Sequence, residues 1–189
     1  MMIPARPTEL AHDWVRAVLR DGDLAIDATA GNGHDTLMLA KAVGPGGRVI
    51  AFDIQSAAID ATRARVEAAG LSSQVELHRV CHSSMGDFVS PGSAAAVMFN
   101  LGYLPGNEHD VITQTHSTLA AIEAALACLK PDGLLTVICY LGHSGGDEEA
   151  REVESFLASM VPHGWRIARY TAIGSRGQAP VLLAARRSA

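Results

Sequence analysis

Two glycines between a short apolar run and a helical pattern form the stretch of this sequence that is best suited to chemistry. Residues 24–28 are apolar enough for a buried strand, and Gly31 and Gly33 come soon after it. Residues 36–43 then continue with the period of a helix. The loop therefore lies between the carboxyl end of a strand and the N-terminus of a helix, where free N–H groups favour nucleotide-like ligands. We expect it to hold a cofactor.

Two departures from the dinucleotide-binding pattern indicate which cofactor this is. Thr36 stands where that pattern has its third glycine, and Asp27 stands before the loop, where a carboxylate would repel a pyrophosphate. The same carboxylate can pair with the cationic amino-acid end of S-adenosylmethionine. Asp53 ends a second apolar run and can accept hydrogen bonds from both ribose hydroxyls. Any one of these residues could simply turn the chain or cap a helix, but their combination favours S-adenosylmethionine.

Polar residues also follow two later strands of the predicted sheet. Residues 81–84, which include His82, follow a strand predicted over 75–80 and can border an adenine. Asn100 and Tyr103 follow a strand predicted over 94–99, where an amide carbonyl and an aromatic ring can lie beside the methyl group that is transferred. The alternative for the second segment is an ordinary Pro-Gly turn.

The order of the predicted elements indicates one α/β domain over residues 1–189. Five strands alternate with helices, and the chain ends in two strands, 165–173 and 181–185, whose short connection favours an antiparallel hairpin. We therefore expect a class I (Rossmann-like) methyltransferase fold: a seven-stranded, mostly parallel sheet with an antiparallel C-terminal hairpin and helices on both faces. Residues 1–22 predict an N-terminal helix that covers one edge of the sheet.

Composition limits the classes of partner and the compartment. The apolar runs are shorter than a membrane span and the first residues lack the pattern of a signal peptide, so we expect a soluble protein without a membrane partner. Three cysteines without a C-x-x-C pair argue against a disulfide framework and favour the cytoplasm. His78 and His82 would lie too far apart on a strand to chelate easily, and we expect no metal.

Charge limits how nucleic acid could be bound. The net charge of −5 argues against a broad basic face, so contacts to phosphates must be local. Arginines near the C-terminus, among them Arg176, Arg186 and Arg187, permit a few such contacts, and Tyr103 and Tyr140 permit base stacking. The sequence also allows a homodimer.

Four segments of the chain resemble one family of bacterial class I methyltransferases. These segments are DATAGNGHDT at 27–36, AFDIQ at 51–55, FNLGYLPG at 99–106 and YLGHSGG at 140–146. The family has long been labelled as rRNA methylases and is associated with methylating 5-aminomethyl-(2-thio)uridine at the tRNA wobble position. The resemblance spans nearly the whole chain. It departs near the C-terminus, where Gly174-Ser175 and Ala179-Pro180 replace the expected Asn-Gln and Pro-Pro.

The resemblance implies an S-adenosylmethionine-dependent N-methyltransferase that makes 5-methylaminomethyl-(2-thio)uridine and contacts the anticodon stem-loop of tRNA. From the resemblance, and more from their positions after the predicted strands, we expect Tyr103, Tyr140 and His143 on the substrate side, with Asn100, Tyr103 and His143 as the catalytic residues. Arg176, one of the late arginines, is expected on the substrate side as well. The cofactor side would comprise Asp27, Thr29, Gly31, Asn32, Gly33, Asp35, Thr36, Asp53, Gln55, His82 and Asn100.

Methyl transfer to an amine requires its neutral form. Asn100 could hold a remaining N–H of the amine while His143 or water takes the proton; alternatively, His143 is a hydrogen-bonded loop residue. Two other functions stay open: a methyltransferase acting on rRNA or a small-molecule amine, and a non-catalytic RNA-binding module. The intact Asp27, Gly31 and Asp53 argue against the last of these.

Overall fold

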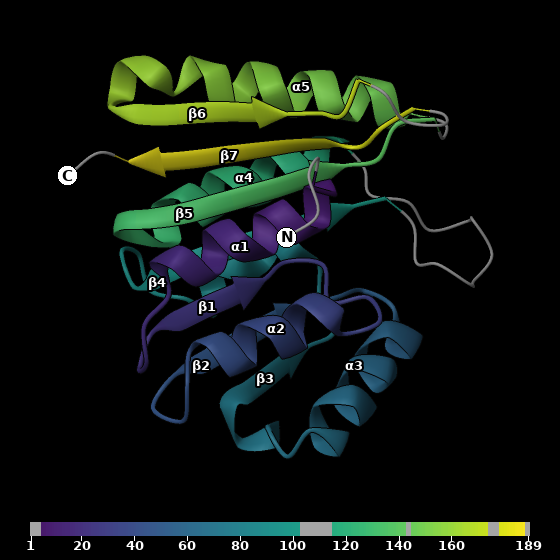
Figure 1. Ribbon diagram of the computed structural model, residues 1–189, viewed down its shortest axis with the longest axis vertical. Helices are drawn as coiled ribbons and strands as arrows, with labels where there is room; N and C mark the ends of the chain where they lie inside the picture. The colour runs from purple at the N-terminus through teal and green to yellow at the C-terminus, as the bar shows by residue number, and fades with distance from the viewer. Residues whose placement is uncertain (1–4, 103–114, 143–144, 174–177, 188–189) are drawn as a thin grey trace.

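Seven strands form one sheet in a computed structural model that describes residues 5–102, 115–142, 145–173 and 178–187. In chain order the strands are β1 (Leu24–Asp27), β2 (Arg48–Phe52), β3 (Val75–His78), β4 (Ala94–Leu101), β5 (Leu129–Cys139), β6 (Trp165–Tyr170) and β7 (Val181–Arg187). Their order across the sheet is β3-β2-β1-β4-β5-β7-β6 (Figure 1). β1 to β5 are parallel, and β7 is antiparallel to both of its neighbours. The predicted mostly parallel sheet with a C-terminal antiparallel hairpin is confirmed.

Helices cover both faces of this sheet. α1 (Pro7–Val18), α2 (His34–Ala42) and α3 (Ser56–Ala68) lie on one face, and α4 (Thr115–Cys128) and α5 (Gly146–Ser159) lie on the other (Figure 1). Three short 3-10 helices complete the described elements: η1 (Ser72–Gln74), η2 (His82–Asp87) and η3 (Val161–His163). No helix within the described ranges combines the length and the apolar character that a membrane crossing requires.

The central strands are apolar throughout because both of their faces are covered. In β1, Ala25 packs into the core beneath α1 and α2, while Ile26 packs into the core beneath α4. Both residues are fully buried. The same alternation continues in β2 with Val49 and Ile50, so the sheet separates two hydrophobic cores.

α1 does not take the edge position that was expected for residues 1–22. The helix ends at Val18 and packs against α2 and against β4, β5 and β7, which are inner strands of the sheet. Ala11 and Val15 are the residues that it buries completely. The segment that leads into α1 reaches an edge strand, where the Tyr170 hydroxyl of β6 donates to the Ala5 carbonyl at 2.8 Å. An amphipathic stripe shows that a helix packs on a sheet, but not over which strands.

The strand directions decide which residues can meet. The carboxyl ends of β1 to β5 lie at one edge of the sheet, on the right in Figure 1, and this brings Asp27, Asp53 and Asn100 to the same region. β7 runs the other way, so Arg186 pairs in register with Leu134 near the opposite edge. Arg186 and Arg187, which the sequence offered for a few phosphate contacts, therefore lie away from the carboxyl ends of β1 to β5.

Gly33 is required where α2 approaches α3, and this generates a prediction about stability. Gly33 has φ +77°, and a Cβ there would lie 2.8 Å from the Thr62 Cα. Gly70 has a similar φ of +70° but open space around it. We expect Gly33→Ala to lower the unfolding free energy by at least about 1 kcal/mol more than Gly70→Ala, because the second variant carries only the backbone strain. Urea denaturation measures both, and equal losses would show that α2 and α3 can separate without cost.

Candidate functional site

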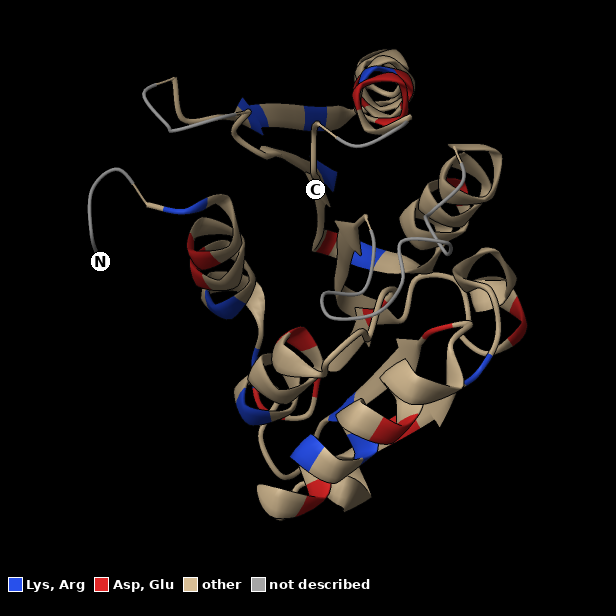
Figure 2. Ribbon diagram, turned by 90° about the vertical axis from the view of Figure 1, so that its right-hand side faces the viewer, with Lys and Arg blue, Asp and Glu red and all other residues tan. Residues whose placement is uncertain are grey.

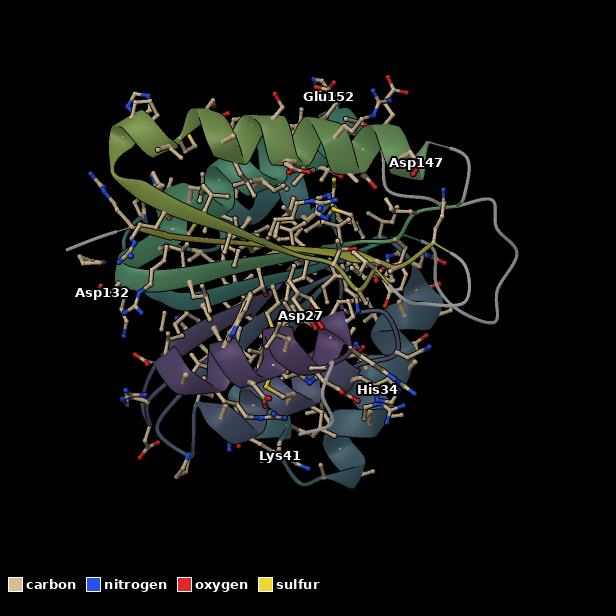
Figure 3. The ribbon with its side chains drawn as sticks, turned by 45° about the horizontal axis from the view of Figure 1, so that its top comes forward. Asp27, His34, Lys41, Asp132, Asp147 and Glu152 are labelled. Atoms are coloured by element: carbon tan, nitrogen blue, oxygen red, sulfur yellow. The ribbon has the colours of Figure 1, made fainter. Side chains whose placement is uncertain are left out.

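The glycine loop closes around the carboxylate of Asp27. Asp27 ends β1 and is fully buried. The Thr36 hydroxyl donates to its Oδ2 at 2.5 Å, and the Thr29 N–H donates to its Oδ1 at 3.1 Å. Thr36 stands at the position where the dinucleotide-binding pattern has its third glycine. Its side chain has a structural use there, because its hydroxyl supplies a hydrogen bond to the buried carboxyl group of Asp27. In Figure 3 Asp27 lies in the interior, whereas the exposed His34 marks the start of α2.

Asp53 ties the same loop to the end of β2. Its Oδ2 accepts from the Gly31 N–H at 3.0 Å, and its Oδ1 accepts from the Gln55 N–H at 2.9 Å. Each carboxylate oxygen can accept a second hydrogen bond. Asp53 can therefore hold the loop and still accept from the hydroxyls of a bound ribose. Gln55 takes part through its backbone, as the N-cap residue of α3.

α3 holds the loop from its other side through two residues that sequence reasoning missed. The Thr62 hydroxyl donates to the Gly31 carbonyl at 3.1 Å, and Arg65 Nε donates to the Asn32 carbonyl at 2.6 Å. Thr62 and Arg65 are three residues apart on a helix, a spacing that places them on one face. That spacing was a usable signal, but it did not say that this face meets the glycine loop.

Asn100 lies beside the loop at the carboxyl end of β4. Its backbone N–H donates to the Thr29 hydroxyl at 2.7 Å, and its Nδ2 donates to Asp35 Oδ2 at 3.2 Å. The other side-chain atom, Oδ1, is buried and has no hydrogen-bond partner among the described residues. A buried carbonyl without a partner is costly, and Oδ1 could accept a hydrogen bond from a ligand that donates an N–H or an O–H.

Asp35, expected on the cofactor side, lies at the centre of a row of polar groups. Besides Asn100 it binds His12, whose Nε2 lies 2.6 Å from Asp35 Oδ1. His12 belongs to α1 and was not singled out from the sequence, since the contact joins residues 23 positions apart. Both oxygens of Asp35 therefore have protein partners.

His82 presents a second unpartnered nitrogen at the same edge. Its Nδ1 donates to the Ala28 carbonyl at 3.2 Å, and its Nε2 is buried without a partner among the described residues. Burial lowers the pKa of His82, so the neutral ring offers Nε2 as an acceptor. His78 does not share a strand with His82: His78 ends β3 and lies 2.8 Å from Glu76. Within the described ranges, no group of three or more His, Cys, Asp or Glu residues could hold a metal.

The site carries an excess of negative charge in its interior. Burial, followed by the charge of Asp35, raises the pKa of Asp27 to about 7 against the hydrogen bonds from Thr36 and Thr29. Burial and the charge of Asp35 also raise the pKa of Tyr140, so this phenol stays neutral at physiological pH. Such a pocket favours a cationic ligand.

The remaining expected substrate residues divide into two groups. Tyr140 follows β5 at the same edge, remains partly exposed, and lies beside Gly102 at the end of β4. Tyr103, His143 and Arg176 fall outside the described residues. The structure thus brings the loop, Asp53, His82, Asn100 and Tyr140 to one edge of the sheet.

Comparisons with known proteins agree with this arrangement. A family model described as "Putative rRNA methylase" matches residues 49–186. The chloroplastic tRNA (mnm(5)s(2)U34)-methyltransferase of Arabidopsis thaliana is 41% identical over 187 residues, which cover 94% of this chain and 68% of that protein.

Two solved structures are similar over their whole length. An rRNA-methylase, so described, from Clostridium thermocellum superposes with a TM-score of 0.94 at 34% identity, covering 98% of this chain and 99% of that one. SMU.1697c of Streptococcus mutans, described as "a putative methyltransferase" and solved in complex with SAH, gives a TM-score of 0.86 at 34% identity, and the match covers 98% of both chains.

The raised pKa of Asp27 predicts a protein that loses stability as the pH rises. The native carboxyl keeps its proton up to about pH 7, whereas the unfolded chain releases it near the ordinary value of 3.8. Between these values the native state binds more protons, so the free energy of unfolding falls with increasing pH. We expect a loss of more than about 1 kcal/mol, because each pKa unit corresponds to about 1.4 kcal/mol.

Urea denaturation between pH 3.8 and about pH 7 measures how the free energy of unfolding changes as Asp27 titrates. Asp27→Asn removes the titrating group, and its stability should depend less steeply on pH than that of the native protein. Asp60→Asn, which alters an exposed carboxylate on α3, is the matched control. Parallel profiles for Asp27→Asn and the native protein would assign the proton to another group.

Proposed function

The chain belongs to the family described as "Putative rRNA methylase", and on this premise we propose that it is an S-adenosylmethionine-dependent N-methyltransferase of tRNA. The acceptor is the primary amine of 5-aminomethyl-(2-thio)uridine at the wobble position, and the product is 5-methylaminomethyl-(2-thio)uridine. The observation that carries this choice is the 41% identity to the Arabidopsis thaliana tRNA (mnm(5)s(2)U34)-methyltransferase over 94% of the chain.

The residues at the sheet edge fit the proposed cofactor. The charge of Asp35 gives the pocket the negative potential that a sulfonium and an ammonium group require, and a bound cation would favour the ionised form of Asp27 as well. Asp53 keeps lone pairs for ribose hydroxyls. His82 Nε2 is a buried acceptor without a described partner, as a ligand with an N–H donor would need. When bound, S-adenosylmethionine supplies an activated methyl group that an amine can displace in line.

The chain's own contribution is to orient a neutral amine. Asn100 Oδ1 can accept one N–H of the acceptor, and because a carbonyl oxygen cannot donate, it leaves the nitrogen lone pair free to attack. Fixing this geometry supplies much of the catalysis that a displacement on an activated methyl group needs. After transfer the amine releases a proton, which the proposal assigns to His143 or to water.

The proposed RNA contact is local. Several arginines are already paired with carboxylates, including Arg63 with Asp60 and Arg169 with Glu154. Lys and Arg segments also alternate with Asp and Glu segments in the view of Figure 2. An anticodon stem-loop, with an unpaired base that can stack on Tyr140, suits such a surface. We place the enzyme in the cytoplasm, and the free Cys81, Cys128 and Cys139 are compatible with that reducing compartment.

Loss of the Asp53 carboxylate should weaken cofactor binding. Hydrogen bonds to charged groups contribute about 1.5–3 kcal/mol, so Asp53→Ala should raise the dissociation constant of S-adenosylmethionine by roughly tenfold or more. Isothermal titration calorimetry measures this constant. Asp60→Ala removes an exposed carboxylate from α3 and should leave the constant unchanged. An unaltered constant for folded Asp53→Ala would remove Asp53 from the cofactor site.

The acceptor is tested with two tRNAs that differ at one group. Purified protein is incubated with labelled S-adenosylmethionine and with tRNA that carries 5-aminomethyluridine or lacks its aminomethyl group. We expect label only in the first, and a 5-methylaminomethyl nucleoside in its mass spectrum. Equal labelling of both tRNAs would refute the proposed acceptor, and labelling of rRNA or of a small amine in their place would move the assignment to that substrate.

A further inference from the structure

Three side chains from three elements form one continuous hydrogen-bonded row behind the proposed acceptor position. His12 projects from α1, Asp35 lies in the first turn of α2, and Asn100 lies near the end of β4. His12 Nε2 is 2.6 Å from Asp35 Oδ1, and Asn100 Nδ2 is 3.2 Å from Asp35 Oδ2. The row therefore links α1 to Asn100, the residue proposed to contact the acceptor.

The row determines which way the Asn100 amide points. A carboxylate only accepts hydrogen bonds, so Asp35 must face the amide NH2 of Asn100, and the carbonyl Oδ1 must point away from it. The reverse orientation would place two oxygens against each other. The backbone of Asn100 is fixed as well, because its N–H donates to the Thr29 hydroxyl at 2.7 Å. The side-chain amide of Asn100 is thus held with its NH2 toward Asp35 and its Oδ1 away from it.

His12 completes the arrangement by satisfying the other oxygen of Asp35. The side chains of His12 and Asp35 are only 21% and 11% exposed, so water competes weakly for this contact. Ala11 and Val15 on either side of His12 are fully buried and fix the position of α1. With His12 absent, Asp35 Oδ1 would lack this partner and the carboxylate could turn toward other donors. α1 therefore does more than cover the sheet.

We propose that Asp35 and His12 are positioning residues for methyl transfer, which hold the Asn100 amide so that its Oδ1 accepts an N–H of the acceptor amine. This inference rests on the proposed function and goes beyond it. It assigns Asp35 to the orientation of Asn100 in place of direct contact with the cofactor, and it gives a role in the reaction to a helix outside the glycine loop.

The test separates positioning from cofactor binding and from folding. Single-turnover methylation of tRNA that carries 5-aminomethyluridine is measured for the native protein and for His12→Leu, His12→Gln, Asp35→Asn and Asp13→Asn, alongside calorimetric cofactor affinity and thermal unfolding. Asp13 is the matched control, since it neighbours His12 on α1 and pairs with the exposed Arg16. Its variant should behave like the native protein.

Positioning predicts a fall in rate without a matching fall in cofactor affinity. His12→Leu should slow the single turnover by about tenfold while the cofactor dissociation constant stays within about twofold. His12→Gln should recover most of the rate, because its amide N–H can again donate to Asp35. Asp35→Asn should slow transfer more than His12→Leu, because an amide at position 35 can face Asn100 with either end.

Several outcomes would overturn the inference. If His12→Leu and His12→Gln both transfer methyl groups at the native rate, His12 does not position Asn100. If Asp35→Asn weakens cofactor binding as much as it slows transfer, Asp35 belongs to the cofactor pocket. In either case the native protein still methylates the tRNA and the proposed function stands. A native protein that leaves this tRNA unlabelled would instead refute the proposed function, and this inference with it.

Discussion

A buried carboxylate at the end of the first strand is the constraint on which the rest of the site depends. Asp27 loses all contact with water, a change that burial alone would make very unfavourable for its charged form. Two donors from the following loop, the Thr36 hydroxyl and the Thr29 N–H, offset part of that cost. They can do so only if the chain turns sharply back on itself. The hydrogen bonds that Asp27 requires therefore determine the shape of the glycine loop. Gly31 and Gly33, both at positive φ, permit its turn.

The other two acids extend this framework to neighbouring elements. Asp53 accepts from the loop and from the start of α3, while Asp35 accepts from α1 and β4. Each acid thus joins two segments that are distant in sequence and keeps the carboxyl edge of the sheet in one geometry. The negative charges of Asp35 and Asp53 raise the pKa of Asp27. A cationic ligand would reduce this repulsion between the acids.

The local parts of this arrangement could be predicted from the sequence, and the tertiary parts could not. The strand that leads to Asp27 and the turn at Gly31 follow from apolar runs and residue types within a dozen positions. His12 and Arg65 reach the site across 23 and 33 positions, through the packing of α1 and α3. A helical spacing can show which residues share a face, but not which loop that face meets. The position of Arg186 also depends on tertiary structure, because the antiparallel direction of β7 carries its end away from the site.

For the proposed function, an acid-rich pocket presents a difficulty for methyl transfer to an amine, and the proposed role of Asn100 resolves it. Carboxylates that attract a sulfonium also favour the protonated form of a nearby amine, which cannot attack. Each oxygen of Asp35 already has a partner, His12 for one and the Asn100 amide for the other. The Asn100 amide is therefore the group that links this acid to the proposed acceptor position. The atom left for the acceptor is a neutral carbonyl oxygen, which can hold an N–H without the full charge that would stabilise an ammonium. An aspartate at position 100 would place a full negative charge beside the acceptor amine and would favour its protonated form. The charge that attracts the cofactor and the group that holds the acceptor would then no longer be separate.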